Sequence, residues 1–193
     1  MRASPIRLSA AAACAAALLA GPPAAGAPDC TLLDLPVART EPPPSQYADF
    51  CAREPGACAL SGAAVLPWTP ELQTALSGVN RAVNARVTLV PDADRGQEER
   101  WDFPVGCEGD CEDFALEKRR ILVAAGLPSA ALTMAIVHHR TRFFPHAVLL
   151  AETTAGTFVL DDLRDEPACW SATPYRFERR ERPDGSWDRY MPV

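Results

Sequence analysis

The sequence predicts an α+β fold in which helices come first and an antiparallel sheet follows. Two observations carry this prediction. Apolar residues recur at steps of three and four in residues 69–87, and short apolar runs separated by turn residues fill residues 131–191. Helices that precede a block of strands, instead of alternating with them, are typical of α+β domains. We therefore expect N-terminal helices packed on an antiparallel sheet.

The N-terminus has the pattern of a secretory signal peptide, which we assign to residues 1–27. Arg2 and Arg7 precede a run of Ala and Leu, and small residues follow around Gly26. The run is too short to span a bilayer, which needs about 20 apolar residues, and no later segment is long and apolar enough. An uncleaved N-terminal anchor is the alternative. We expect a periplasmic or secreted protein without a membrane span.

Residues 28–193 have the size of one domain. Residues 28–70 are rich in Pro and small residues and are predicted to form an N-terminal arm, followed by a core over residues 71–193. Hydrophobic residues make up 48% of the chain, which is enough for a core. The net charge of −6 argues against nucleic acid or an anionic membrane surface as a partner, because both attract basic patches.

Six cysteines follow the signal segment, and disulfides are expected in an exported chain. Cys51 and Cys58 flank a short turn-forming segment and are predicted to bridge it. Cys107 with Cys169 is the candidate second bridge, and Cys30 has no obvious partner. A structural zinc site is not expected, because no C-x-x-C pair is present and the three histidines do not cluster with cysteines.

Two helices and five strands are predicted. Thr69-Pro70-Glu71 offers a capping hydroxyl, a proline at the first helical position and an acid, and begins the first helix. The second helix begins at Gly109-Asp110-Cys111 and ends before Gly126. Residues 91–100 are a charged loop. The strands are predicted at residues 131–138, 146–152 and 157–161, with a closing hairpin of 175–180 and 187–191.

Cys111 is a candidate nucleophile, because backbone N–H groups and the dipole at a helix start favour the thiolate. A buried structural cysteine or half of a disulfide is the alternative. His146 opens an apolar strand and Asp161 ends the next one. An even turn length puts these two side chains on one face of the sheet, and a two-residue turn at Thr153-Thr154 would place them directly opposite each other. An odd number of residues in the turn would put the two side chains on opposite faces of the sheet. On one face, they complete a thiol triad of nucleophile, base and orienting acid.

Three segments resemble the motifs of a known family: residues 109–115 (GDCEDFA), 146–149 (HAVL) and 159–163 (VLDDL). They are similar to the bacterial transglutaminase-like cysteine peptidases, which include the LapG-type periplasmic proteases that release biofilm adhesins from the cell surface. Residues 79–84 and the Trp101-x-x-Pro104 segment also resemble that family, so the likeness covers roughly residues 45–170. It implies a papain-like α+β fold with the triad Cys111, His146 and Asp161.

The resemblance also implies a reaction. An exported cysteine peptidase of this kind would cleave a protein substrate, such as a surface adhesin, through an acyl-enzyme. By resemblance alone, a membrane protein could regulate it. The same triad could instead transfer the acyl group to an amine, as transglutaminases do, and the sequence does not separate these outcomes.

Asp110, Glu112 and Asp113 flank the candidate nucleophile. Acids in the first turn of a helix can simply complement its dipole, yet like charges raise the pKa of a neighbouring thiol. A Ca²⁺ ion bound to their oxygens would cancel that charge. The three acids match the calcium-binding positions of LapG-type members, so the resemblance implies Ca²⁺ as a cofactor. Further ligands must come from elsewhere, since Ca²⁺ takes about six to eight oxygens.

Two features depart from the family pattern. Asp162 stands where the family usually has Asn, which could weaken or retune the site, and Cys107 adds a thiol near Cys111. A Cys107–Cys111 disulfide would inactivate the site, whereas a Cys107–Cys169 bridge is compatible with activity. Both departures favour the alternative of a catalytically silent, calcium-responsive binding module with the same fold.

Overall fold

The computed structural model describes residues 30–96 and 98–192, so the predicted signal peptide lies outside the described residues. Within those residues, no helix combines the length and the apolar character that a membrane crossing needs. The helices are α1 (Ser45–Arg53), α2 (Pro55–Cys58), α3 (Pro70–Arg86) and α4 (Cys111–Ala124), with 3-10 turns at Asp92–Arg95, Ser129–Ala131 and Trp170–Ala172. The strands are β1 (Val37–Glu41), β2 (Thr88–Leu89), β3 (Glu108–Gly109), β4 (Leu132–His139), β5 (Pro145–Thr153), β6 (Gly156–Asp161), β7 (Arg164–Cys169), β8 (Tyr175–Glu181) and β9 (Trp187–Tyr190).

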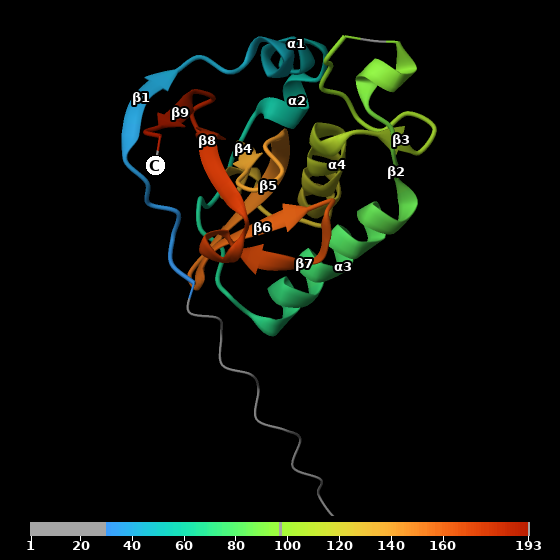
Figure 1. Cartoon of the computed structure of the whole chain (residues 1–193). Coiled ribbons are helices and arrows are strands. Elements are labelled where there is room, and N and C mark those ends of the chain that lie inside the picture. The colour runs from blue at the N-terminus through green and yellow to red at the C-terminus, as the bar shows by residue number, and fades with distance from the viewer. Residues whose placement is uncertain (1–29, 97, 193) are drawn as a thin grey trace, which may run out of the picture.

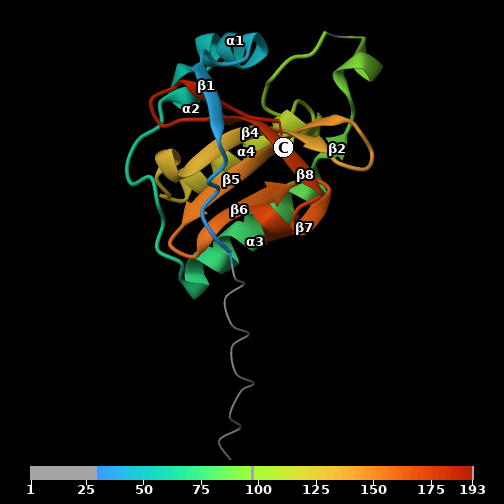
Figure 2. The same ribbon diagram turned by 60° about the vertical axis from the view of Figure 1, so that its left-hand side comes forward.

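Seven strands form one sheet in the order β1-β9-β8-β4-β5-β6-β7, and every pair in it is antiparallel. Helices α3 and α4 cover one face, and the N-terminal segment before β1 crosses the other (Figures 1 and 2). Strands β2 and β3 make a separate parallel pair. The predicted α+β class, with helices packed on an antiparallel sheet, is confirmed.

The two long helices begin where the sequence predicts. The Thr69 hydroxyl caps α3 by accepting a hydrogen bond from the Leu72 N–H at 3.2 Å. Leu72 and Leu76 of α3 then pack with Leu116 and Leu122 of α4 in the core between helices and sheet. This layer fixes α4 beneath β5 and so determines where the start of α4 lies.

The hairpin of β5 and β6 sets the relation between His146 and Asp161. Thr153 pairs with Gly156, so the turn holds two residues, an even number, and the two side chains share a face. The turn is nevertheless one residue later than Thr153-Thr154. Because Leu149 pairs with Leu160, the register continues with Asp161 level with Val148 instead of directly opposite His146.

The predicted N-terminal arm contains regular elements that its composition did not indicate. Strand β1 pairs with β9 at the sheet edge, and α1 buries Tyr47 and Phe50 in the same core as α3 and α4. These elements are short, and only two residues of α1 are buried, so the segment shows little hydrophobic periodicity.

A buried ion pair joins α4 to the sheet and to α1. The Arg119 guanidinium donates to the Glu181 carboxylate at 2.6 Å and to the Tyr47 hydroxyl at 2.8 Å. The Tyr47 hydroxyl donates to the other Glu181 oxygen, and the Met134 N–H donates to Glu181 as well. The side chains of Arg119 and Glu181 are 3% and 1% exposed, and both charges have partners, which buried ions require.

One disulfide prediction is confirmed and one is wrong. Cys51 and Cys58 are bridged, as predicted. The expected Cys107–Cys169 bridge is absent, because Cys169 pairs with Cys30, while Cys107 is an exposed free thiol. The cause is the N-terminal segment: its residues hydrogen-bond along β6 and bring Cys30 to the end of β7.

The two disulfides should differ in their effect on stability. Cys30 and Cys169 lie 139 positions apart, whereas Cys51 and Cys58 lie 7 apart. A longer closed loop restricts the unfolded chain more, so replacing both Cys30 and Cys169 by Ser should lower the free energy of unfolding by about 2.5 kcal/mol more than replacing Cys51 and Cys58. Urea unfolding of the two double variants measures this difference. Equal losses would contradict the expectation.

Candidate active site

Cys111 is the first residue of α4, and its thiol lies against the start of β5. The Ala147 N–H points to the Cys111 Sγ at 3.4 Å, and the thiol donates to Glu112 Oε2 at 3.2 Å. Since Ala147 directly follows His146, this contact brings the predicted nucleophile and base to the same place. Both line one cleft of about 550 Å³.

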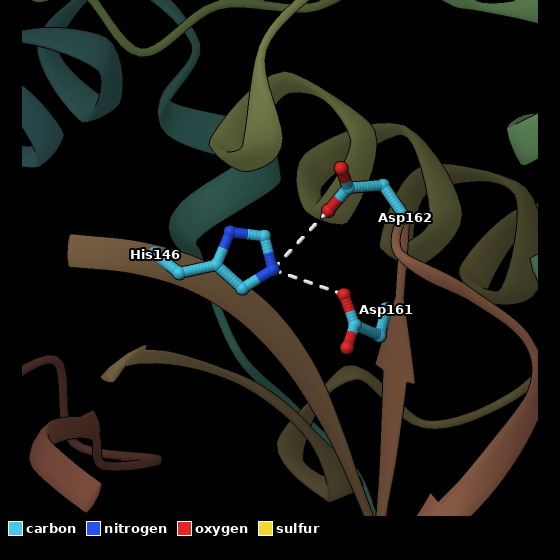
Figure 3. A group of neighbouring side chains, drawn as sticks. All are labelled: His146, Asp161 and Asp162. Atoms are coloured by element: carbon cyan, nitrogen blue, oxygen red, sulfur yellow. Dashed lines mark hydrogen bonds and ion pairs between the residues drawn. The ribbon is translucent and has the colours of Figure 1, made fainter. Parts of the chain in front are cut away.

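His146 and Asp161 form a hydrogen-bonded pair beside this cleft. The His146 Nε2 lies 2.9 Å from Asp161 Oδ1, and their side chains are 4% and 1% exposed. The other ring nitrogen, Nδ1, points away from the carboxylates (Figure 3). Asp162 also faces the ring, with its Oδ1 3.3 Å from His146 Nε2. The departure from the family pattern at residue 162 therefore lies directly at the histidine.

Besides His146, hydrogen bonds from β8, from the turn after β6 and from α3 hold Asp161. The Tyr175 hydroxyl donates to Asp161 Oδ2, and the Leu163 N–H donates to Oδ1 at 3.0 Å. The Asp161 N–H donates to the Asn80 side chain of α3, whose amide group donates in turn to the Arg164 and Asp165 carbonyls. Burial opposes ionisation of Asp161, yet the His146 and Tyr175 hydrogen bonds hold its pKa below the ordinary value.

The walls of the cleft are mainly apolar. Ile136, Phe144 and Leu163 line it together with Trp101. Trp101 is 4% exposed and packs edge-on against Trp187 of β9, so it belongs both to the core and to the cleft wall.

The predicted metal ligands separate into two environments. Ligand oxygens of Asp110 and Glu112 lie within 4.8 Å of each other and of Asp92, a residue of the charged loop. Asp113 is held differently, because its Oδ1 accepts from the Asp102 N–H at 2.9 Å and its Oδ2 lies 3.6 Å from Arg95. The glycine of the Gly-Asp-Cys motif permits this packing, since a Cβ at position 109 would lie 2.7 Å from the Asp113 Cβ.

The group of Asp92, Asp110 and Glu112 fits a hard cation. Asp110 Oδ1 and Glu112 Oε1 are buried, and no described residue donates a hydrogen bond to either. Asp110 occupies the N-cap position of α4, but its side chain does not cap the helix; the Asp92 N–H donates to its Oδ2 at 3.3 Å. Carboxylate oxygens are the ligands that Ca²⁺ prefers.

The charges of these acids oppose each other and the thiolate. Burial, then repulsion from Asp110 and Glu99, raises the pKa of Glu112 to about 10. Burial and Asp110 raise the pKa of Asp113 to about 7, against the hydrogen bond from the Asp102 N–H. Burial, then the charge of Glu112, raises the pKa of the Cys111 thiol well above its ordinary value. The repulsion expected from the sequence is present.

Several residues of the site were not predicted. Among them, Asp92 joins the acidic group from the 3-10 turn at Asp92–Arg95, the Tyr175 hydroxyl reaches Asp161 from β8, and Gln46 of α1 lines the cleft. Their sequence neighbourhoods carry no motif that indicates these contacts. Asn80 lies within residues 79–84, a segment that resembles the family, but the resemblance assigned Asn80 no role.

A thiol at a helix start beside a His–Asp pair on an antiparallel sheet defines a thiol enzyme of the transglutaminase-like class. Residues 37–189 match the family described as bacterial transglutaminase-like cysteine proteinase (BTLCP), and the chain belongs to this family. It is therefore a transglutaminase-like cysteine peptidase, and a protein is its class of substrate.

Solved structures of LapG from Legionella pneumophila are similar to this chain. The calcium-bound form is 28% identical, with 63% of this chain and 73% of that chain covered and a TM-score of 0.55. A second structure is 30% identical over 61% and 68% of the two chains, with a TM-score of 0.54. An EGTA-treated form is 29% identical over 61% and 67%, with a TM-score of 0.53. Comparison with curated proteins gives no match.

Asn80 should stabilise the turn that carries Asp161. Its side chain is fully buried and hydrogen-bonds to both sides of that turn. Asn80→Ala leaves the buried Asp161 N–H without its acceptor and removes a donor from the Arg164 and Asp165 carbonyls, so the free energy of unfolding should fall by about 2 kcal/mol. Gln73→Ala, which removes an exposed amide from the same helix, is the matched control and should change it by less than about 0.5 kcal/mol. Similar losses in the two variants would refute this role.

Proposed function

We propose that the chain is an exported cysteine endopeptidase in which Cys111 is the nucleophile, His146 the base and Asp161 the residue that orients the base. The observation that carries the proposal is the shared cleft. The Cys111 thiol lies beside the start of β5, and His146 turns Nε2 to Asp161 and Nδ1 away from it (Figure 3). This leaves Nδ1 as the atom that accepts the thiol proton.

The reaction follows the chemistry of thiol triads. The proton of Cys111 passes to His146 Nδ1, and Sγ attacks the carbonyl carbon of a peptide bond. The imidazolium, stabilised by the Asp161 carboxylate, protonates the leaving amine and leaves an acyl-enzyme. Water, deprotonated by His146, then releases the product acid. The first N–H groups of α4 have no partner within the helix, so that of Cys111 is the proposed donor to the oxyanion.

The proposed calcium site consists of Asp92, Asp110 and Glu112, with the third predicted ligand, Asp113, beside them. Its support is the pair of buried oxygens without donors and the nearness of Asp92. Bound Ca²⁺ would supply the positive charge that removes the repulsion between these acids and the Cys111 thiolate. The calcium-bound form of LapG from Legionella pneumophila supports calcium as the ion.

The sequence pattern, the disulfides and the family likeness support a location and a substrate. The N-terminal sequence pattern and the two disulfides are consistent with export to the periplasm or beyond. We propose a surface adhesin as the substrate, on the strength of the family likeness. The expected regulatory membrane protein stays a prediction.

Replacement of the triad residues tests the catalytic assignment. With a fluorescence-quenched peptide selected from a library by turnover, Cys111→Ala and His146→Ala should each lower kcat/KM by about 10³-fold or more, as in other triads. His138→Ala is the matched control, because His138 pairs with Glu178 and not with an acid at the cleft. It should change kcat/KM less than threefold. If His146→Ala retains a tenth of the activity, His146 is not the base.

Removal of calcium tests the metal assignment and separates an enzyme from a silent binding module. The exposed Cys107 would also react with iodoacetamide, so the experiment uses Cys107→Ser. Alkylation of Cys111 at pH 7 should slow at least tenfold in EGTA, because a rise of one pKa unit in the thiol removes about nine-tenths of the thiolate. Added Ca²⁺ should restore the rate.

Matched variants locate the ion. Asp92→Asn should reproduce the slow alkylation even in Ca²⁺, and Asp113→Asn tests the share of the third predicted ligand. Asp94→Asn changes an exposed acid of the same 3-10 turn and should have no effect. A Cys111 that reacts like an ordinary thiol with and without Ca²⁺ would favour the binding module.

A further inference from the structure

His146 faces one carboxylate more than a triad requires. Its Nε2 lies 2.9 Å from Asp161 Oδ1 and 3.3 Å from Asp162 Oδ1 (Figure 3). A neutral imidazole has one N–H, and Asp161 accepts it. The Asp162 side chain is only 5% exposed, so its Oδ1 is buried. Because Asp161 accepts the imidazole N–H, Asp162 Oδ1 has no hydrogen-bond donor among the described residues. A buried carboxylate without a partner is costly and calls for an explanation.

Lys118 does not supply that partner. It is the only lysine of the chain and lies buried on α4. Burial lowers its pKa to about 8, against the attraction of Asp162, Asp161 and Asp165. In residues 30–96 and 98–192, no ion pair within 4.0 Å joins Lys118 to Asp162; the only such partner of Asp162 is His146. Lys118 therefore adds positive charge at a distance but does not occupy the Asp162 oxygen.

The three side chains have the geometry of metal ligands. One nitrogen of His146 and one oxygen each of Asp161 and Asp162 all lie within 4.8 Å of one another. Tetrahedral Zn²⁺ bonds nitrogen and oxygen at about 2.0–2.2 Å, which separates its ligand atoms by about 3.4 Å. The two distances from Nε2 need to open by only a few tenths of an ångström to reach this value.

The surroundings also suit an ion. The Tyr175 hydroxyl and the Leu163 N–H fix Asp161, as outer hydrogen bonds fix metal-binding carboxylates. His146 and Asp162 both line the cleft, which gives an ion a path in and leaves room for water as the fourth ligand.

We propose that His146 Nε2, Asp161 Oδ1 and Asp162 Oδ1 bind Zn²⁺ and that the bound ion inhibits the peptidase reversibly. The ion takes the lone pair of Nε2, so the single proton of the neutral imidazole moves from Nε2 to Nδ1. That nitrogen then has no lone pair to accept the proton of Cys111. The inhibitory effect rests on the proposed role of His146 as the base, whereas the binding itself does not. Asp162 is the residue that turns a His–Asp pair into a three-ligand site.

Calorimetric titration with Zn²⁺ tests the binding directly. The protein carries Cys111→Ala and Cys107→Ser, which remove the free thiols as zinc ligands, and excess Ca²⁺ occupies the separate acidic group. We expect one equivalent of Zn²⁺ to bind. Asp162→Asn should weaken binding at least about tenfold. Asp165→Asn, an exposed acid on the next strand, should leave it unchanged.

The activity of protein with Cys111 intact gives the second readout. Zn²⁺ should inhibit peptide hydrolysis, and Asp162→Asn should raise the half-inhibitory concentration at least tenfold. Two results would overturn the proposal: no binding once Cys111 is replaced, or equal binding by the Asp162→Asn and Asp165→Asn variants. Because the calorimetric result needs no substrate, a failure of the proposed peptidase mechanism leaves the test of the zinc site intact.

Discussion

The position of α4 against the sheet is the constraint on which the rest of the site depends, and the buried Arg119–Glu181 pair fixes it. A small shift of the helix would leave one of these charges without its partner in a region from which water is excluded, which is costly. Cys111 lies about two turns earlier on the same helix. The pair therefore fixes the position along β5 that the Cys111 thiol contacts. Tyr47 of α1 accepts a hydrogen bond from Arg119, so α1 is joined to the same ion pair.

The start of α4 carries more negative charge than a helix can stabilise alone. The helix dipole is equivalent to about half a unit of positive charge at this end. A Cys111 thiolate, Asp110 and Glu112 would place three negative charges there. Arg95 lies nearby, but it pairs with Asp92 and Asp113. A bound cation is the simplest physical way for thiolate and acids to coexist, and the acidic motif would make the proposed nucleophile depend on that cation.

The sequence predicted those parts of the fold that carry their own local signals. Helix α3 has a capping threonine and a regular apolar stripe, and β5 and β6 are apolar runs around a short turn. The sequence also indicated where Cys111, His146 and Asp161 lie, because each stands at the start or end of a predicted element. The turn parity then put the histidine and aspartate on one face.

The remaining features depend on contacts between distant segments. Cys30 meets Cys169 only because the N-terminal segment runs along β6, and nothing near either residue indicates this path. Asp92 reaches the acidic group from a loop without periodicity. The oxygen of Asp162 likewise has no donor because Asp161 accepts the imidazole N–H. The spacing of these residues along the chain does not specify which aspartate accepts it.

The pairing of β1 with β9 joins the first strand of the sheet to the last. Trp187 of β9 also packs against Trp101, which forms part of the cleft wall. During synthesis, the chain therefore lacks the support of this wall until β9 has been added. Contacts of such long sequence separation also form late in folding. This topology delays completion of the cleft until both β1 and β9 are available, which limits the opportunity for a nascent protease to cleave its neighbours.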